Sequence, residues 1–513
     1  MESDTYKIAL VVPLFCDQKE FRDMIVEYLG FGYLAAYLRK NNVQVDIIDA
    51  FVQKKSVGEV VAQLEAGQYD LLGFTLMSSD YFKSMGSILD KISYEIIERS
   101  HIMVGGYYTT FKKDTLFEMD GRINSIIVGE GENTVLELVE RLAKKQGLAG
   151  VRGIFYKENN VVYKNINRPL ITEQELNALP FPARDNIHTV INENGSVQVL
   201  SSRGCFGRCT FCAVNFYYNS HEGRNWRGRS PENVVAEIEE LVLNYGVRYI
   251  HFTDEEFIGP GVRGRKRACK IAELIIEKQL DINFSMYCRA DNVEEQTFLL
   301  LKKAGLDSVF LGVEFGVQDS LDRYLKGITV AQIKKALSTL ESLKIKTKVG
   351  YMMFEPLIQL EEFRESLRFC FENLKFTLRR VMSQMAIYPN SGAYYRLKDK
   401  VEFDEQLTFD PLFGDHLKYK FKDEKVEFLF RMLKESLPVI SPSKKYLEIM
   451  NERSKERKNA LIKQWSSDVY HMIDEAATQI SIESNLTEKN LMSYSSSFKE
   501  RLEVWDRSWV AVN

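Results

Sequence analysis

The chain has 513 residues, 45% of them hydrophobic and 27% charged, with a formal net charge of -4. This composition is that of a globular chain with room for several domains, and it excludes a disordered or low-complexity protein. The negative balance gives no basic footprint for nucleic acid, and no apolar stretch is long enough to span a bilayer. We therefore expect a cytoplasmic protein with neither nucleic acid nor a membrane as partner.

Residues 1–148 alternate short apolar runs with helical patterns, which predicts a parallel sheet flanked by helices. The expected strands are residues 7–12, 44–48, 71–75, 101–104 and 125–128. Such a flavodoxin-like or Rossmann-like domain binds its ligand beyond the C-terminal ends of the strands. The loops there are rich in Gly and Ser, which let a flat ligand or its phosphate approach the backbone. Their candidate residues are Met77, Ser78, Ser79, Gly105, Gly106, Gly129 and Glu130.

Residues 149–192 are expected to form a hairpin and a linker, and a second α/β domain follows over residues 193–396. Its expected strands are residues 197–202, 249–253, 282–287, 308–314, 346–353 and 380–387. Six such β/α units predict a partial (β/α)6 barrel of the TIM type, with its site at the C-terminal ends of the strands. Residues 397–513 are charged and helical in pattern, which predicts a C-terminal helical domain that caps the barrel or docks a protein partner.

Three cysteines, Cys205, Cys209 and Cys212, follow the first barrel strand in a C-x3-C-x2-C spacing. A [4Fe-4S] cluster normally takes four thiolates, so a set of three leaves one iron open to a small molecule. The alternative is a structural zinc site with His221 as fourth ligand. The spacing favours the cluster, because structural zinc usually takes paired two-cysteine knuckles and bulky aromatic residues fill the gap before His221.

Charged residues recur at the same mouth of the expected barrel. Glu255 and Glu256 follow the second strand, Arg289 follows the third, and Glu314 ends the fourth. An isolated charge at such a place is usually a surface ion pair. Charges at successive strand ends instead indicate a binding site beside the cysteine loop.

With Phe211 before the last cysteine, the loop resembles the C-x3-C-x-aromatic-C loop of radical S-adenosylmethionine enzymes. The resemblance extends over roughly residues 5 to 395, through the segments 252–256, 285–291 and 312–318. It implies that S-adenosylmethionine chelates the open iron and is cleaved by one electron to a 5'-deoxyadenosyl radical. It also implies that Phe211, Glu255, Glu256, Arg289 and Glu314 contact S-adenosylmethionine, and that an external one-electron reductant of the flavodoxin or ferredoxin type serves the cluster.

The linker 179–185 and the loops at Gly105 and Gly129 resemble those of family members with an N-terminal cobalamin-binding domain. That resemblance implies that the candidate loop residues of the first domain bind cobalamin. No histidine precedes His101, so a lower axial histidine is absent from the usual place, and Leu76 or Met77 is the candidate to face cobalt. The alternative is a degenerate, empty domain.

The resemblance predicts a cobalamin-dependent C-methyltransferase that acts on an unactivated carbon of a small metabolite. One S-adenosylmethionine would methylate cobalamin, and a second would supply the radical. The alternatives are a cyclisation, dehydration or rearrangement without methyl transfer, and a cluster-based sensor. Methylthiotransferases carry a second cluster, and they are excluded because Cys16 is the one cysteine before residue 205.

Overall fold

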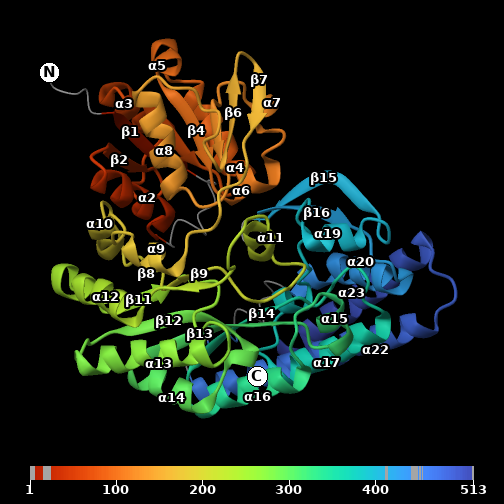
Figure 1. The fold of residues 1–513 in the computed structure, drawn as a ribbon. Helices are drawn as coiled ribbons and strands as arrows, with labels where there is room; N and C mark the ends of the chain where they lie inside the picture. Colours follow the sequence, from red (N-terminus) through yellow and green to blue (C-terminus); the bar gives the residue numbers. More distant parts are fainter. Residues whose placement is uncertain are drawn as a thin grey trace.

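The computed structural model describes residues 6–14, 25–410, 414–440, 449, 452 and 454–510. Cys16 lies outside the described residues. In Figure 1 the first domain stands above the barrel, and the C-terminal helices lie beside the barrel. No helix among the described residues combines the length and the apolar character needed to cross a bilayer.

The first domain is built on a seven-stranded sheet in the order β2-β1-β3-β4-β5-β6-β7. Its strands are β1 (Lys7–Val12), β2 (Gln44–Asp49), β3 (Leu71–Thr75), β4 (His101–Gly105), β5 (Ser125–Ile127), β6 (Ile154–Glu158) and β7 (Val161–Lys164). The first five are parallel and confirm the predicted strands. The predicted hairpin adds β6 antiparallel to β5, and β7 antiparallel to β6. The order of the parallel strands is that of flavodoxin-like folds, with the ligand crevice between the ends of β1 and β3.

Helices cover both faces of this sheet. On one face α2 (Leu29–Lys40) and α8 (Glu132–Ala143) bury Leu34, Leu38 and Leu138 against β1 and β3. The other face is covered by α3 (Val57–Gly67), α4 (Ser79–Leu89), α5 (Tyr94–Arg99) and α7 (Leu116–Met119), while α6 (Tyr107–Lys112) follows β4. The central strands β1, β3 and β4 are therefore buried on both faces, which is why they are apolar runs in the sequence, whereas the edge strand β2 is partly exposed.

After α9 (Glu173–Ala178) and α10 (Ile187–Asn192), the second domain forms a five-stranded parallel sheet in the order β14-β13-β12-β11-β8. The strands are β8 (Val197–Val199), β11 (Tyr249–Phe252), β12 (Asn283–Arg289), β13 (Leu306–Glu314) and β14 (Lys346–Tyr351), and a short pair β9 (Ser202–Arg203) and β10 (Arg227–Gly228) leads into the cysteine loop. The helices are α11 (Ala213–Asn219), α12 (Pro231–Tyr245), α13 (Gly261–Glu277), α14 (Glu295–Lys303), α15 (Gln318–Arg323), α16 (Val330–Ser342) and α17 (Leu360–Asn373), with a 3-10 turn at η1 (Ala290–Asn292). The sheet is a partial barrel, as predicted.

The sixth strand, predicted over residues 380–387, is wrong. Thr377 accepts a hydrogen bond from the backbone N–H of Arg380 (3.3 Å) and begins a short helix, α18 (Leu378–Val381). The Arg380 guanidinium donates to the carbonyl of Val349 (3.5 Å) and ties this helix to β14. Two isolated bridges, Phe354 with Gln384 and Ile387 with Leu417, are formed where the strand was expected. Val381, Met385 and Ile387 are buried, so the segment has the apolar character of a strand, but it does not form a continuous ladder with a neighbouring strand.

The C-terminal region is helical as predicted, except for one antiparallel ribbon. The ribbon consists of β15 (Phe403–Asp410) and β16 (Gly414–Tyr419), and the helices are α19 (Gly392–Leu397), α20 (Glu424–Ser436), η2 (Leu437–Ile440), α22 (Lys455–Ile482) and α23 (Glu488–Val510). α22 packs on α17, where Tyr470 stacks on Phe371 with ring centroids 4.4 Å apart. The ribbon stands upright toward the first domain in Figure 1. There Asp415 accepts hydrogen bonds from the backbone N–H (2.7 Å) and the hydroxyl (2.6 Å) of Ser79.

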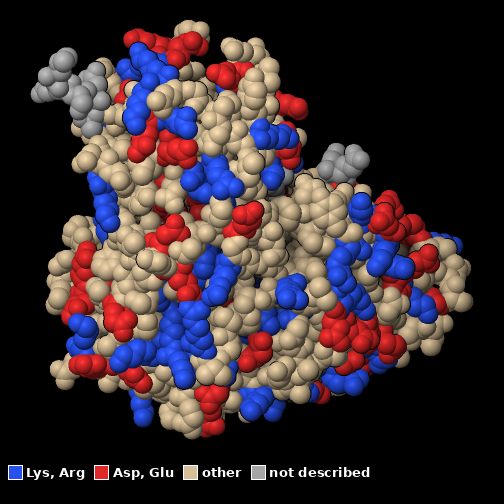
Figure 2. Space-filling view, in the orientation of Figure 1, with Lys and Arg blue, Asp and Glu red and all other residues tan. Residues whose placement is uncertain are grey.

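Charge on the face shown in Figure 2 is mixed rather than of one sign. Basic side chains gather over the part of this face where Figure 1 places α12 and α13, and α13 carries Arg263, Arg265, Lys266 and Lys270. Acidic side chains border them. Arg263 forms an ion pair with Glu173, and Lys270 forms one with Glu273. The visible surface therefore shows no continuous basic field of the kind that nucleic acid requires.

Candidate functional site

The cysteine loop begins at Gly204, immediately after β9, and ends at the first turn of α11. Gly204 has φ of +81° and lies against Asn225, so a side chain there would clash with the backbone. Cys209 is buried, Cys205 and Cys212 are half-buried, and all three thiols are free. Burial raises the pKa of Cys205 to about 12 and that of Cys212 to about 11. Thiolates at these positions therefore need positive charge or metal beside them.

Two buried cations supply positive charge next to these thiols. Arg289 ends β12 and donates to the sulfur of Cys209 (3.7 Å) and to the carbonyl of Lys326 (2.9 Å). The Lys326 ammonium lies 3.1 Å from Glu314 Oε1. Burial lowers the pKa of Lys326, but Glu314 and Cys209 more than offset it, so the net pKa is raised and the group stays charged. Sequence reasoning missed Lys326, which follows a helix rather than a strand.

Glu314 holds an unusual backbone conformation at the end of β13. Its φ is +68°, and the register of β13 against β14 shifts between Gly312 and Glu314. A Cβ on Gly312 would lie 2.8 Å from Glu314 Oε1, and one on Gly350 would lie 3.3 Å from Glu314 Oε2. The two glycines therefore make room for a carboxylate that turns back over the barrel interior. Non-glycine residues at positive φ are costly and cluster at functional sites.

The two glutamates after β11 have different surroundings. Glu255 Oε2 accepts from the backbone N–H of Gly204 (3.0 Å), and its Oε1 accepts from the hydroxyls of Tyr107 (3.3 Å) and Tyr218 (3.4 Å). Glu256 accepts from the backbone N–H of Gly259 (2.5 Å) and the amide of Asn292 (2.9 Å), and burial raises its pKa to about 7. Glu255 thus joins the cysteine loop to the first domain, and Glu256 fixes its own loop.

A cavity of about 1420 Å³ lies between the first domain and the barrel. On the first-domain side it is lined at the C-terminal edge of the sheet by Val12, Thr75, Met77, Gly105, Gly106 and Gly129. On the other side it runs along the barrel interior, past Glu255, His251, Tyr287 and Phe310. Pockets for single drug-sized molecules are roughly 300–1,000 Å³, so this cavity is large enough for more than one such ligand.

Of the predicted loop residues of the first domain, Met77, Gly105, Gly106, Gly129 and Glu130 line this cavity, but Ser78 and Ser79 do not. Ser79 is instead hydrogen-bonded to Asp415. Leu76 is fully buried in the core under the sheet, which leaves Met77 as the cavity-lining member of the two residues expected to face cobalt. The Tyr28 hydroxyl donates to the sulfur of Met77 (3.6 Å).

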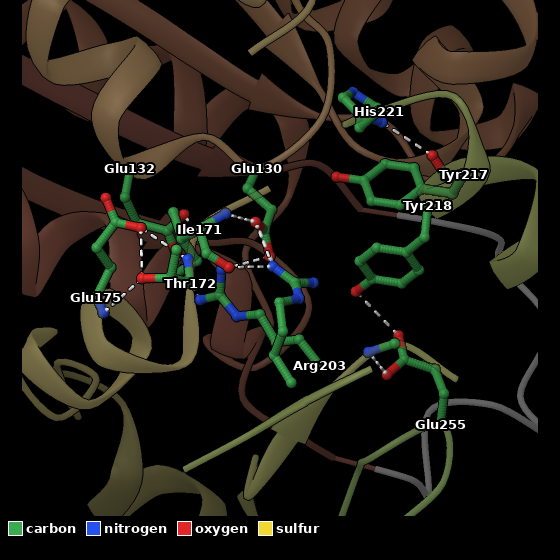
Figure 3. Close-up of polar contacts among 12 residues, drawn as sticks. Glu130, Glu132, Ile171, Thr172, Glu175, Arg203, Tyr217, Tyr218, His221 and Glu255 are labelled. Carbon is green, nitrogen blue, oxygen red and sulfur yellow. Dashed lines mark hydrogen bonds and ion pairs between the residues drawn. The ribbon is translucent and has the colours of Figure 1, made fainter. Parts of the chain in front are cut away.

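A buried ion network joins the two domains at one wall of the cavity. Arg203 lies within 3.2 Å of Glu130 and 2.5 Å of Glu132, and Arg227 lies 2.8 Å from Glu130. Figure 3 shows the carboxylates of Glu130 and Glu132 directed at the barrel and Tyr218 directed at Glu255. Burial raises the pKa of Glu130, but Arg203 and Arg227 more than offset it, and the net pKa is lowered. Glu130, predicted as a ligand residue, therefore also clamps the domains together.

His221 does not join the cysteines. Its Nδ1 is hydrogen-bonded to the carbonyl of Tyr217 (3.0 Å), and a Cβ on Gly129 would lie 2.4 Å from its Nε2, so the ring stands against the first domain. Within the described residues, no three His, Cys, Asp or Glu side chains are arranged around a single metal ion. His221 therefore does not serve as the fourth ligand that the zinc interpretation requires.

The comparisons with known proteins agree with this geometry. The family model for the radical SAM superfamily matches residues 199–370, and that for the B12 binding domain matches residues 23–139. The chain therefore contains a radical SAM domain, which is the barrel with the cysteine loop, and a B12-binding domain, which is the flavodoxin-like domain above it. With these domains the chain is a radical SAM enzyme.

Relatives of this radical S-adenosylmethionine enzyme match about two thirds or more of the chain. A protein from Pyrococcus horikoshii named uncharacterized methyltransferase PH0819 is 29% identical over 66% of this chain and 72% of its own length. The 4'-phospho-dehydrooxetanocin synthase of Priestia megaterium is 30% identical over 74% of this chain, but the match spans only 52% of that protein. The solved structure of the cobalamin-dependent radical enzyme OxsB, with aqua-cobalamin and S-adenosylmethionine bound, covers 99% of this chain and 80% of its own, with a TM-score of 0.79 and 22% identity. That likeness shows the fold.

The radical SAM domain takes a [4Fe-4S] cluster and S-adenosylmethionine, and the B12-binding domain takes cobalamin. The residues present fit the cluster, because three free thiols on one loop lie near the buried cations Arg289 and Lys326. Three thiolates hold three irons of a cubane cluster and leave the fourth open.

The first domain also fits a ligand with hydrogen-bonding groups. Thr75 ends β3, lines the cavity and is buried, and its hydroxyl makes no hydrogen bond of good geometry in the described protein, although the Tyr28 hydroxyl lies beside it. Unpartnered buried hydroxyls are uncommon and cost free energy, so such a group in a cofactor cavity fits an amide-rich ligand such as cobalamin. His101, the histidine nearest to Thr75 in the sequence, begins β4 and does not line the cavity. Its ring is hydrogen-bonded to Ser125 (2.8 Å).

We expect Thr75→Val to weaken cobalamin binding by about fivefold to tenfold, the worth of one hydrogen bond. The melting temperature of the cofactor-free protein should not fall, because the lost hydroxyl makes no hydrogen bond of good geometry there. Cobalamin titration and thermal unfolding test both statements. Thr110→Val is the matched control, since Thr110 is also a buried, unpartnered threonine but does not line the cavity. Equal affinity of the two variants for cobalamin would contradict the assignment.

Proposed function

We propose that this enzyme transfers a methyl group to an unactivated carbon of a small molecule. When bound, cobalamin supplies the methyl carrier, and S-adenosylmethionine at the cluster supplies the 5'-deoxyadenosyl radical that removes a hydrogen atom from the substrate. The relative named as a methyltransferase supports this assignment. The observation that carries it is the cavity, because one continuous space is lined by the cofactor edge of the first domain and by the barrel interior.

The chain's own residues have distinct roles in this proposal. Arg289 and Lys326 hold the carboxylate of S-adenosylmethionine next to the cysteine loop. Both are charged and buried, Arg289 donates to Cys209, and Cys209 helps to raise the pKa of Lys326. Glu314 receives the ribose hydroxyls from above the barrel interior. Phe211 packs edge-on against Phe315 (5.8 Å) and Tyr324 (6.4 Å), which fixes the loop beneath the nucleoside.

Glu255 keeps the two cofactor regions in register. It bonds Gly204 of the cysteine loop and Tyr107 of the first domain at once, so movement of either domain is transmitted to the other through one carboxylate. Burial raises the pKa of Glu255. Glu256 supports this arrangement through its bonds to Gly259 and Asn292 rather than by touching S-adenosylmethionine.

The partners of the proposed reaction are a small-molecule substrate and an external one-electron donor. The cluster needs one electron for each radical that it generates, and a flavodoxin or ferredoxin type of protein in the cytoplasm is the predicted source. This partner and this location stay predictions.

The products test the proposal. The full chain, loaded anaerobically with iron, sulfide and cobalamin, is given S-adenosylmethionine, a reductant and candidate substrates. We expect S-adenosylhomocysteine, 5'-deoxyadenosine and a substrate that is heavier by one methylene, with both by-products formed in proportion to the methylated product. Without cobalamin, methylation and S-adenosylhomocysteine should cease while slow 5'-deoxyadenosine formation persists. Substrate turnover with 5'-deoxyadenosine alone would contradict methyl transfer.

The second candidate function is a rearrangement or cyclisation without methyl transfer. It is favoured by the relative of Rubrivivax gelatinosus named anaerobic magnesium-protoporphyrin IX monomethyl ester cyclase, which is 27% identical over 74% of this chain and 68% of its own length. The same assay separates the two functions, since the rearranged product keeps its carbon count and no S-adenosylhomocysteine is formed.

A further inference from the structure

Two cations in the large cavity have no partner. The charged side chains that line this cavity are Glu27, Asp49, Glu130, Glu132, Arg203, Glu255, Lys348 and Arg379. The first six are bound by ion pairs or hydrogen bonds. Within the described part of the chain, Lys348 and Arg379 make no hydrogen bond or ion pair. An unbalanced pair of cations in a cavity attracts an anionic ligand group.

The register of the barrel sheet places Lys348 below the cysteine loop. Tyr287, Phe310 and Lys348 are neighbours in one row across β12, β13 and β14, and Arg289, Gly312 and Gly350 form the next row toward the cysteines. His251 lies one row farther from the cysteines than Lys348. Its neighbour Ser285 pairs with Ser308, which is two residues before Phe310 on β13. Burial, and then the charge of Lys348, lower the pKa of His251, so the ammonium lies near the row that is farther from the cluster.

Arg379 reaches the same part of the cavity from another element. It belongs to α18, the short helix in place of the predicted sixth strand, and its neighbour Arg380 is hydrogen-bonded to Val349 beside Lys348. Both Lys348 and Arg379 are exposed at this end of the cavity. A strand at this place would pair with β14, whereas the helix tied to Val349 leaves the cavity open here.

Aromatic rings line the cavity in the row of Lys348 and in the rows beyond it. Tyr287 lies 5.3 Å from the ring of His251 and 5.2 Å from that of Phe310, measured between centroids. Phe310 and Tyr249 are 38% and 42% exposed although they line a cavity, so their faces are free to pack on a ligand. Exposed aromatic faces of this kind stack on flat rings.

We propose that Lys348 and Arg379 form the anion subsite of the substrate, which is a ring-containing molecule with a phosphate or carboxylate group. This inference rests on the proposed function, because it assigns the barrel part of the cavity to the substrate. The row of Lys348 lies four residues before Glu314 along β13, about 13 Å in an extended strand. The anion is thus held at the level of Lys348, the ring packs on Tyr287 and Phe310 in the same row, and the reacting carbon points to the cluster.

The test measures binding without turnover. The full chain is loaded with its cluster and cobalamin, and saturating S-adenosylmethionine without reductant occupies Arg289 and Lys326. Isothermal titration calorimetry then compares two matched pairs of probes, phenyl phosphate with phenol and benzoate with benzamide. We expect an anionic probe to bind at least ~10-fold more tightly than its neutral partner, because charge-assisted hydrogen bonds are stronger than neutral ones. Preference for phenyl phosphate assigns a phosphate, and preference for benzoate assigns a carboxylate.

Variants locate the subsite. Lys348→Gln and Arg379→Gln should each weaken the anionic probes about tenfold and leave the neutral probes unchanged. Lys346→Gln is the matched control, since Lys346 is on the same strand but is paired with Asp307 (2.9 Å) and does not line the cavity. Melting temperatures verify that the variants are folded.

Three results would overturn the anion subsite: no binding by either anionic probe, equal binding of the anionic and neutral probes, or a preference that survives loss of both cations. None of these measurements needs a methylated product. A protein that binds the anion but never forms S-adenosylhomocysteine would therefore reject the proposed methyl transfer and leave the subsite standing.

Discussion

Cys209→Ala is expected to abolish cleavage of S-adenosylmethionine, with 5'-deoxyadenosine formation at least ~10³-fold lower than in the wild type. Cys209 is the most buried of the three loop cysteines, 7% exposed, and it is the thiol that receives the Arg289 guanidinium. With one thiolate lost, the loop has two ligands for a cluster that already lacks a protein ligand at its open iron. Iron content per chain and timed formation of 5'-deoxyadenosine measure the effect.

The control for this experiment is Cys269→Ala. Cys269 is a free cysteine in α13 whose sulfur lies 3.8 Å from the Thr297 hydroxyl, away from the loop. We expect this variant to keep its full iron content and its rate. A Cys209→Ala protein that retains iron and cleaves S-adenosylmethionine normally would place the cluster elsewhere.

Arg203→Met is expected to destabilise the protein by about 3–5 kcal/mol, the cost of leaving buried carboxylates without their partner. Arg203 is 8% exposed and pairs with Glu130 and Glu132 of the first domain. Methionine keeps the bulk of the side chain, so the loss is one of charge and hydrogen bonds. Because the clamp forms one wall of the cavity, cobalamin retention should fall together with the melting temperature.

Arg141→Met is the control for the clamp, because Arg141 is half-exposed and reaches only Glu137 at 3.7 Å. Such a surface pair contributes at most about 1 kcal/mol. The pKa of Glu130 is lowered in the folded protein, so its contribution to stability is complete above its ordinary value of 4.5 and is lost as the pH falls through the lowered value. Arg203→Met should therefore flatten the acid side of the stability profile. An unchanged melting temperature would show that the domains are held elsewhere.

Much of the fold is predictable from local pattern. The five parallel strands of the first domain and five strands of the barrel are fully or partly buried apolar runs, and their ends lie within a few residues of the predicted positions. The charges at successive strand ends predicted that Arg289 and Glu314 lie together, because parallel strands place their C-terminal ends together. In the structure both contact Lys326, and Arg289 also donates to Cys209 of the loop.

The rest depends on contacts between residues that are distant in the chain. Residues 380–387 are apolar enough for a strand, but Thr377 starts a helix there and Arg380 fastens it to β14. The charged C-terminal sequence hides the ribbon β15–β16, whose alternation of polar residues is weak. Lys326 follows a helix and has no motif around it, so only its contact with Glu314 identifies it. Glu130 and Ser79 were read as ligand residues, and their pairing with Arg203 and Asp415 could not be read from sequence.

The bond between Asp415 and Ser79 has a consequence for how the protein matures. Ser79 begins α4, immediately after the Met77 loop of the cofactor cavity, and its partner lies 336 positions later in the chain. Domains fold in order as they leave the ribosome, at about 5–20 residues per second. The B12-binding domain is therefore complete for many seconds before Asp415 is synthesised. The loop at Met77 gains the hydrogen bonds from Ser79 to Asp415 only when the ribbon folds. A chain that ends before residue 415 therefore has a first domain without these two hydrogen bonds.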